Sequence, residues 1–178
     1  MEKTLVVLKP DSVQRGVVGE IITRFEKAGL KILAIKMIEP NEDHYFEHYE
    51  TIGQVISRRG QKVFDDNLEF MRAGPVVAIV LEGVEAVSLV RKMVGDTEPK
   101  ASSPGTIRGD YAHMSYGHAN EHGVGIPNLI HASGSNEEAK LEITLWFSIE
   151  ELHSYETLHE KFTNAFSMKK SNKKQPKK

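Results

Sequence analysis

The chain has 178 residues, of which 39% are hydrophobic and 27% are charged, and this length and composition are typical of a globular protein with one domain. The absence of cysteine excludes a disulfide framework, a thiolate zinc site and a cysteine nucleophile. No apolar run approaches the roughly 18 residues that a membrane span requires, and the apolar segment near the N-terminus is too short for a signal peptide. We therefore expect a cytoplasmic protein that does not contact membranes.

The net charge of −2 conceals an uneven distribution, because six lysines lie in residues 169–178, which contain no acidic residue. Residues 1–168 therefore carry 17 basic and 25 acidic side chains. A basic stretch without apolar residues buries too little surface to fold. We expect a folded domain over residues 1–168 and a disordered lysine-rich tail over residues 169–178. The acidic body argues against nucleic acid as a partner, although a basic tail by itself attracts polyanions.

Hydrophobic periodicity predicts the first elements of the chain. Residues 4–8 form a short apolar run, ended by Pro10, which is typical of a buried strand that delivers Lys9 to its end. Apolar residues recur on one helical stripe over residues 17–28, so we expect an amphipathic helix there. The alternating pattern of residues 30–38 predicts a second strand.

The middle of the chain continues with helices and one strand. Asn41 is a plausible N-cap for a helix that runs toward residue 49. A polar break at residues 57–60 separates it from a second helix, which carries Phe64. The continuous apolar run of residues 76–81 predicts a buried strand, and residues 84–94 show helical periodicity again.

The last third contains a long connection and three further elements. Residues 96–127 are rich in glycine and proline, and long loops of this kind are usually functional, so we interpret the stretch as a functional loop. Residues 128–131 predict a short strand. Ser135 with Glu138, and Ser148 with Glu151, fit capping boxes that begin two more helices. The order β-α-β-β-α-β predicts an α+β, ferredoxin-like fold, with helices packed on a four-stranded antiparallel sheet.

A histidine and several cations are the candidates for chemistry, since the chain contains neither a P-loop nor a complete dinucleotide-binding fingerprint. His131 ends an apolar strand and is followed by small residues, which leaves one imidazole nitrogen accessible, and Glu142 is a carboxylate able to hold the other. Taken alone, such a histidine is also compatible with a purely structural role. Cations that suit phosphate binding, each equally compatible with a solvated surface position, are Lys9, Arg15, Arg91 and Arg108.

Five motifs follow one another in a characteristic order. They are Lys9-Pro10-Asp11, Gly105-Thr106-Ile107-Arg108-Gly109-Asp110, Asn128-Leu129-Ile130-His131-Ala132-Ser133, Glu142-Ile143 and Leu145-Trp146-Phe147. In type and order they resemble the nucleoside diphosphate kinase family, and the resemblance covers nearly all of residues 3–153. It implies reversible, ping-pong transfer of the γ-phosphoryl group from a nucleoside triphosphate to a nucleoside diphosphate through a phosphohistidine on His131.

The resemblance also implies roles for the surrounding residues. Lys9 would meet the terminal phosphate and a ribose hydroxyl, and Tyr49 would steady the transferred phosphate. The other phosphates would be held by Arg91, Thr97 and Arg108, the ribose by Asn128, and His131 itself by Ser133 and Glu142. Mg2+ would be carried on the nucleotide phosphates, without a metal site of the protein's own. The family forms homo-oligomers, so we expect a hexamer or a tetramer.

The chain departs from the family pattern at several positions. Val63, with Phe64 beside it, stands where an aromatic residue would stack on the nucleobase, and Gly134 replaces an aspartate. The segments formed by residues 52–61 and 111–127 are longer than the family pattern requires. The second of these insertions contains three histidines, for which we favour solvated loop positions over a transition-metal site: His113, His118 and His122.

A competing interpretation is a catalytically weak relative that acts as a nucleic-acid-binding or scaffold protein through its basic tail. A damaged active site would favour it. However, every position to which the resemblance gives a role in catalysis or in binding phosphate and ribose is intact, and we therefore favour the enzyme.

Overall fold

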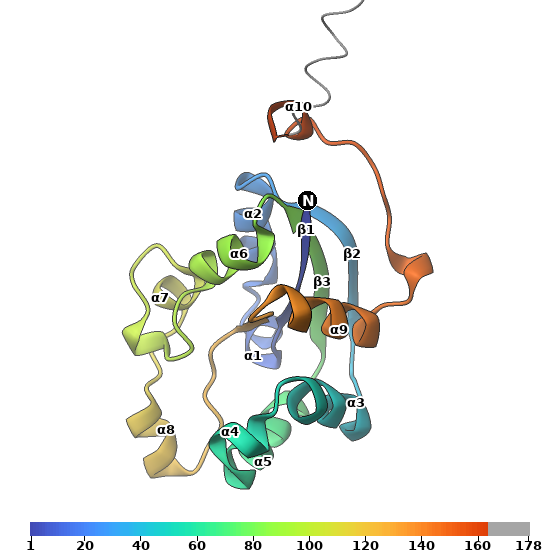
Figure 1. The fold of residues 1–178 in the computed structure, drawn as a ribbon. Coiled ribbons are helices and arrows are strands. Elements are labelled where there is room, and N and C mark those ends of the chain that lie inside the picture. The colour runs from blue at the N-terminus through green and yellow to red at the C-terminus, as the bar shows by residue number, and fades with distance from the viewer. Residues whose placement is uncertain (164–178) are drawn as a thin grey trace, which may run out of the picture.

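Four strands form one open sheet in the order β2-β3-β1-β4, and all neighbouring strands are antiparallel (Figure 1). Their bounds are β1 Glu2–Leu8, β2 Lys31–Ile38, β3 Val76–Gly83 and β4 Ile130–Ala132. The computed structural model describes residues 1–163, so the predicted tail at 169–178 lies outside the described residues. The predicted ferredoxin-like α+β fold is confirmed.

The helices connect and cover these strands. They are α1 Pro10–Gln14, α2 Val18–Lys27, α3 Glu42–Phe46, a π-helix Glu47–Ile52, α4 Val55–Arg59, α5 Gln61–Met71, α6 Ala86–Val94, a 3-10 turn Pro99–Ala101, α7 Ile107–Tyr111, α8 Tyr116–His122, α9 Asn136–Trp146, a 3-10 turn Ile149–Glu151 and α10 Glu160–Thr163. None of the helices within residues 1–163 is long and apolar enough to cross a membrane.

The sheet has a hydrophobic core on each face. Alternate residues of β1 point to opposite faces, so Val6 and Leu8 pack with α2 and α6, whereas Leu5 and Val7 pack with α3, α5 and α9. Because both faces of β1 are covered, its inner residues are all buried, and the strand therefore appears in the sequence as a continuous apolar run.

Three sequence predictions about local structure need correction. The polar segment at 57–60 separates two helices as predicted, but the break is Gly60 alone, whose φ is +90°, because α4 continues through Arg59. The long connection at 96–127 contains α7 and α8, each begun by a side-chain N-cap, Thr106 and Ser115 respectively. The predicted capping box of Ser148 forms, but it begins a single 3-10 turn and not a full helix.

The segment that follows the 3-10 turn Ile149–Glu151 packs against strand β2. The backbone N–H of His153 donates to the carbonyl of Leu33 at 2.8 Å, and the hydroxyl of Tyr155 donates to the carbonyl of Ile32 at 2.9 Å. Farther along, Glu160 pairs with Lys31 at 2.9 Å. These contacts attach the C-terminal segment to β2 near the irregularity between Ile32 and Ala34.

Candidate active site

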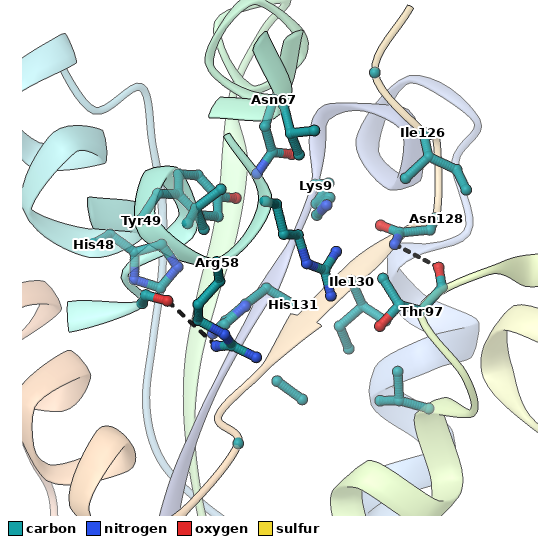
Figure 2. Close-up of a pocket in the computed structure, with 18 of the residues that line it drawn as sticks. Lys9, His48, Tyr49, Arg58, Asn67, Thr97, Ile126, Asn128, Ile130 and His131 are labelled. Atoms are coloured by element: carbon teal, nitrogen blue, oxygen red, sulfur yellow. Dashed lines mark hydrogen bonds between the residues drawn. The ribbon is translucent and has the colours of Figure 1, made fainter. Parts of the chain in front are cut away.

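A cleft of about 810 Å³ lies where β1 ends beside β4, and residues of α4, α5 and α8 are part of its lining. Figure 2 shows Lys9, Tyr49, Asn128 and His131 among the residues around it. Nine of the residues predicted for the site line it: Lys9, Tyr49, Val63, Arg91, Thr97, Arg108, Asn128, His131 and Glu142. The chain thus brings most of the predicted site together, although its members come from positions that are far apart in the sequence.

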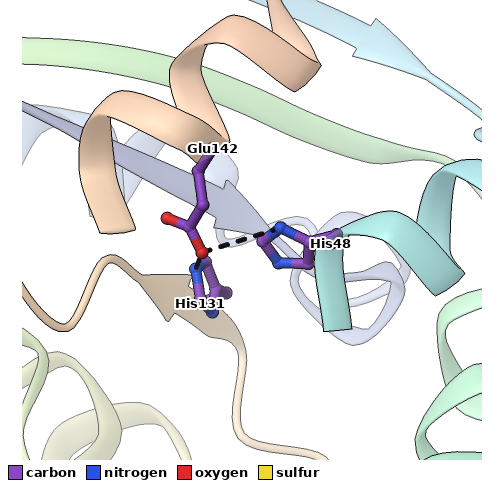
Figure 3. A group of neighbouring side chains, drawn as sticks. All are labelled: His48, His131 and Glu142. Atoms are coloured by element: carbon purple, nitrogen blue, oxygen red, sulfur yellow. Dashed lines mark hydrogen bonds and ion pairs between the residues drawn. The ribbon is translucent and has the colours of Figure 1, made fainter. Parts of the chain in front are cut away.

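His131 reaches Glu142 because of strand register. In the β1–β4 pair His131 lies opposite Val7, so both side chains are on the face that α9 covers. On α9 the buried stripe includes Ala139, Glu142 and Trp146, which places the carboxyl group beside the imidazole. Nε2 of His131 lies 2.7 Å from Oε1 of Glu142 (Figure 3). A carboxylate accepts, so Nε2 is the protonated nitrogen and Nδ1 keeps its lone pair.

Ser133 fixes the other oxygen of the carboxylate. Its hydroxyl donates to Oε2 of Glu142 at 2.6 Å and accepts from the backbone N–H of Leu5 at 3.1 Å. Both Ser133 and Glu142 are completely buried. The carboxylate is therefore anchored to β1 as well as to its own helix, so Ser133 supports the histidine from behind the cleft without lining it.

The cations are held in low-dielectric surroundings. Arg108 donates to three backbone carbonyls, those of Asn128 at 3.0 Å, Gly95 at 3.1 Å and Ile130 at 2.5 Å. Burial, with the nearby charge of Arg91, lowers the pKa of Arg108 to about 10. Burial and the charge of Arg108 lower the pKa of Lys9 to about 8. An anionic ligand would relieve this crowding of positive charge.

Two buried polar atoms at the cleft have no hydrogen-bond partner among residues 1–163: the hydroxyl of Tyr49 and Oδ1 of Asn128. Burial raises the pKa of Tyr49, so its phenol stays protonated and is a donor. Asn128 donates through Nδ2 to the carbonyl of Thr97 at 2.9 Å, which leaves its oxygen as an acceptor. The cleft thus offers one donor and one acceptor whose partners a ligand must supply.

The structure separates the two residues predicted to meet the base. Val63 is 40% exposed and lines the cleft. Phe64 is 5% exposed and packs edge to face on Phe46, with ring centroids 5.7 Å apart. Successive residues on a helix point about 100° apart, so α5 presents the valine to the cleft and turns the phenylalanine into the core.

Several residues at the cleft were missed by the sequence analysis. Arg58 and Arg59 line it from the end of α4, the segment interpreted as a break. The ring of His48 lies 4.5 Å from that of His131, centroid to centroid. His48 precedes Tyr49 in the chain, but nothing in the sequence pattern indicates that it is buried beside another histidine.

Gly134 stands where the family resemblance implies an aspartate, but the mouth of the cleft is not left without a carboxylate. Its backbone N–H donates to Oε2 of Glu138 at 2.9 Å, and Glu138 also lines the cleft. The predicted capping box of Ser135 is therefore only half formed: Ser135 accepts from the backbone N–H of Glu138, whereas the Glu138 side chain binds one residue earlier.

Metal-ligand atoms gather at one place within residues 1–163. Ligand atoms of His48, His131 and Glu142 lie within 4.8 Å of one another, and their hydrogen bonds already account for this proximity. On α8 the rings of His118 and His122 lie 4.1 Å apart, and Nδ1 of His122 lies 2.9 Å from the carbonyl oxygen of His118.

Comparison with known proteins gives one family. A family model described as nucleoside diphosphate kinase matches residues 2–152. The nucleoside diphosphate kinase of Borreliella burgdorferi is 41% identical over 155 residues, which cover 87% of this chain and 92% of that protein. That of Pyrococcus furiosus is 47% identical over 159 residues, covering 87% and 88% of the respective chains.

Solved structures of nucleoside diphosphate kinases are similar to this chain as well. A transition-state mimic of the Borrelia burgdorferi enzyme with bound vanadate and ADP matches with a TM-score of 0.88 at 40% identity, covering 91% of this chain and 96% of that one. A Halobacterium salinarum nucleoside diphosphate kinase in complex with CDP matches with a TM-score of 0.74 at 37% identity, covering 91% and 97%.

Proposed function

The chain belongs to the nucleoside diphosphate kinase family, and on that premise we propose that His131 is the residue that carries the phosphoryl group from a nucleoside triphosphate to a nucleoside diphosphate. The observation that supports this most directly is the pairing of Nε2 of His131 with Glu142 at 2.7 Å, which leaves Nδ1 as the nucleophilic nitrogen of a residue that lines the cleft.

The transfer needs no proton to leave the histidine. The Nδ1 lone pair attacks the γ-phosphorus, a nitrogen–phosphorus bond forms, and the bond from that phosphorus to the bridging oxygen breaks, so that the nucleoside diphosphate leaves. Positive charge develops on the imidazole ring, and the carboxylate of Glu142 stabilises it through Nε2–H. An acceptor diphosphate attacks the same phosphorus in reverse and restores the free histidine.

The other residues of the cleft position the nucleotide. Lys9 supplies a positive charge for the terminal phosphate and a donor for a ribose hydroxyl. Tyr49 supplies a hydroxyl donor for the transferred phosphoryl group. Arg91 and Arg108, together with Thr97, bind the remaining phosphates. Oδ1 of Asn128, which has no hydrogen-bond partner within residues 1–163, is an acceptor for a ribose hydroxyl.

Magnesium enters this scheme on the nucleotide. The group of ligand-type side chains at the cleft contains two imidazoles, whereas Mg2+ prefers oxygen ligands. We therefore assign the metal to phosphate oxygens of the substrate, where it neutralises part of their charge. The protein contributes the cations around it.

The domain and its assembly are part of the same proposal. Residues 1–168 form the kinase domain, with insertions near 52–61 and 111–127, and the protein is a homo-oligomer, a hexamer or a tetramer. Strand β2 lies at the edge of the sheet and exposes Ile35 and Met37, which are 50% and 57% accessible. An exposed apolar edge strand favours covering by another chain. A native mass measurement on the wild type and on Met37→Glu tests this.

The catalytic assignment is tested by incubating the protein with a nucleoside triphosphate and Mg2+ without acceptor. We expect one phosphate per chain on His131, detected by mass spectrometry at neutral or alkaline pH because phosphohistidine is labile in acid, and its release when a diphosphate is added. His131→Asn should bind nucleotide but not transfer, whereas His118→Asn, an exposed control on α8, should behave like the wild type. Turnover without label on His131 would show that the assignment is wrong.

A further inference from the structure

Two imidazoles lie against one carboxylate. Oε1 of Glu142 is 2.7 Å from Nε2 of His131 and 3.6 Å from Nδ1 of His48, and the two rings meet at an interplanar angle of 80° (Figure 3). Catalysis as proposed above requires the carboxylate to bind His131. If His48 carried a proton on Nδ1, a small movement would let it donate to the same oxygen, share its negative charge and weaken its hydrogen bond to His131.

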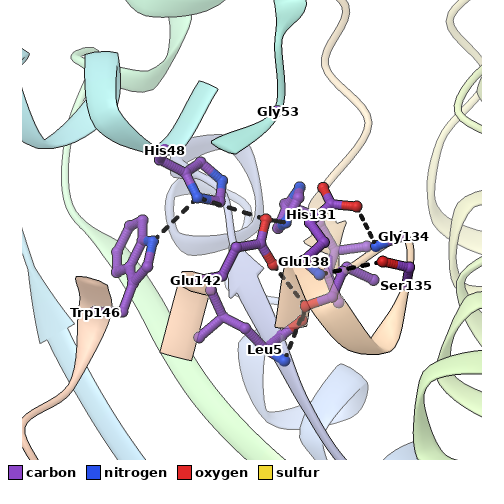
Figure 4. Close-up of polar contacts among 12 residues, drawn as sticks. Leu5, His48, Gly53, His131, Gly134, Ser135, Glu138, Glu142 and Trp146 are labelled. Atoms are coloured by element: carbon purple, nitrogen blue, oxygen red, sulfur yellow. Dashed lines mark hydrogen bonds and ion pairs between the residues drawn. The ribbon is translucent and has the colours of Figure 1, made fainter. Parts of the chain in front are cut away.

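A third residue determines which ring nitrogen of His48 carries the proton. The indole Nε1–H of Trp146 donates to Nδ1 of His48 at 3.2 Å (Figure 4). An indole nitrogen only donates, so the atom that it contacts must be an acceptor. Nδ1 of His48 therefore carries a lone pair, and the proton of the neutral ring is on Nε2. In that tautomer His48 has no hydrogen to offer Glu142.

The alternative tautomer is unfavourable at this position. A proton on Nδ1 would face the indole N–H, and Trp146 would keep a buried donor without a partner. Trp146 is 2% exposed and its ring is fixed on a second side by His44, whose ring meets it edge on at 4.5 Å. Trp146 lies one helical turn after Glu142 on the same stripe of α9, so the donor and the carboxylate are held by one rigid element.

The surroundings keep His48 neutral. Its ring is fully enclosed, and the groups around it are Glu142, His131, His44, Lys9, and the aromatic rings of Tyr49 and Trp146. Burial, with the nearby His131, lowers its pKa well below the usual value. The 3.6 Å approach to Glu142 is consequently not an ion pair.

We propose that Trp146 is a positioning residue of the transfer reaction: by holding His48 in the tautomer that cannot donate to Glu142, it reserves that carboxylate for His131. The inference rests on His131 being the phosphorylated residue. It assigns His48 no contact with the substrate. It makes the indole nitrogen, and not merely the bulk of the ring, the functional part of Trp146.

The decisive variants form a double-mutant cycle. Trp146→Phe keeps an aromatic ring but removes the donor, and we expect single-turnover phosphorylation of His131 to slow by about tenfold, the scale of one hydrogen bond to a charged group. His48→Phe removes the competing nitrogen and should leave the rate within about twofold of the wild type. In Trp146→Phe/His48→Phe the rate should return to that of His48→Phe, because no competitor remains.

A purely structural role for Trp146 predicts a different pattern. Lost packing would slow the reaction to the same extent whether or not His48 is present, so additive effects in the cycle would overturn the proposal. An unchanged rate in Trp146→Phe would overturn it as well. Tyr155→Phe, outside the cleft, controls for general aromatic substitution.

The tautomers are also measurable in the wild type, without relying on a variant that folds poorly. Long-range 15N–1H NMR correlations of the imidazoles should show His48 and His131 both protonated on Nε2, and His48 partly or fully protonated on Nδ1 in Trp146→Phe. A wild-type His48 protonated on Nδ1 would refute the inference. Absence of label on wild-type His131 would instead refute the proposed function, so the two failures are distinguishable.

Discussion

The backbone N–H of Leu129 donates to Oδ2 of Asp11 at 3.0 Å, and Leu129 has a φ of +71°, in the left-handed region that a branched residue rarely adopts. The hydroxyl of the adjacent Ser12 donates to the carbonyl of Leu129 at 2.6 Å. Helix α1 thus holds both backbone groups of a strained residue. Since Leu129 lies between Asn128 and β4, this clamp sets the directions in which Asn128 and His131 point.

Removing the acceptor should therefore affect both stability and catalysis. In Asp11→Ala the buried N–H of Leu129 loses its partner, which we expect to lower the free energy of unfolding by about 1–3 kcal/mol. The value of kcat/KM should fall as well, because the proposed ribose contact, Asn128, and the proposed nucleophile, His131, lose their relative orientation. Urea denaturation and steady-state kinetics measure the two effects. Asp65→Ala, an exposed acid on α5, should change neither. Lower stability with an unchanged kcat/KM would show that the clamp is only structural.

Lys9 should impose an alkaline limit on substrate capture. Burial lowers its pKa to about 8, so in the free enzyme the ammonium loses its proton as the pH rises through that value. The neutral amine attracts phosphate weakly, and kcat/KM reports groups of the free enzyme, so we expect kcat/KM to fall above about pH 8. Lys9→Arg should move this fall to higher pH. A flat wild-type profile up to pH 10 would contradict the assignment.

The same shift has a consequence for folding. The folded-state pKa of about 8 is below the ordinary lysine value of 10.5, so the unfolded chain binds more protons between these values and the free energy of unfolding should rise with pH there. At pH 7 the buried ammonium is destabilising. Lys9→Met should therefore remove the rise and increase stability at pH 7 by about 1–3 kcal/mol while it lowers turnover. Thermal unfolding between pH 7 and pH 10 measures both effects, and a Met variant less stable than the wild type would contradict this account.

Val63 and Phe64 are adjacent on α5, but truncating Val63 should mainly lower kcat/KM, whereas truncating Phe64 should mainly lower the free energy of unfolding. Val63→Ala trims an apolar wall of the cleft against which we propose that any base packs without its edge being read, so kcat/KM should fall by less than about tenfold and similarly for all nucleoside diphosphates. Phe64→Ala leaves a cavity in the core and should cost about 3–5 kcal/mol of stability. Kinetics across the common diphosphates, with urea denaturation, separate the two. A wild-type preference among bases far above about 1–3 kcal/mol would show that other groups read the base.

The sheet and the long helices were predictable from the sequence because burial imposes a period. Strand β1 is covered on both faces, and α2 and α6 each present one apolar stripe. The short helices α4, α7 and α8 escaped prediction for a physical reason. Five to seven residues span too few turns to show a period, and such helices owe their stability to caps and tertiary contacts.

The site was predictable where residues sit in motifs or at strand ends, as Lys9 and His131 do. The family resemblance added Tyr49 and Asn128. What the sequence does not reveal is proximity between side chains on different elements. The contact of His48 with Glu142 and Trp146 depends on how the π-helix packs against α9, and the direction of Phe64 depends on the rotation of α5. These are tertiary properties without a local sequence signature.

Gly134 and Glu138 together provide a further test of how this chain differs from its family pattern. A side chain at position 134 would collide with Oε2 of Glu138, which accepts the Gly134 N–H at 2.9 Å. Restoring the family residue with Gly134→Asp should thus displace Glu138, break that hydrogen bond and bring two carboxylates together. We expect no gain in kcat/KM and a loss of about 1 kcal/mol of stability, or a Tm lower by about 2–4 °C.

The collision makes the effects of these two positions non-additive. In Gly134→Asp/Glu138→Ala the new carboxylate has room, so its cost relative to Glu138→Ala alone should nearly vanish, and the activity should stay close to that of the wild type because one carboxylate remains at the mouth of the cleft. Glu137→Ala, an exposed neighbour at the start of α9, should not relieve the cost of Gly134→Asp. Differential scanning calorimetry measures these costs in Gly134→Asp, Glu138→Ala, Glu137→Ala and the double variants Gly134→Asp/Glu138→Ala and Gly134→Asp/Glu137→Ala. If Gly134→Asp raises kcat/KM while Glu138 is present, then Glu138 does not substitute for the family aspartate.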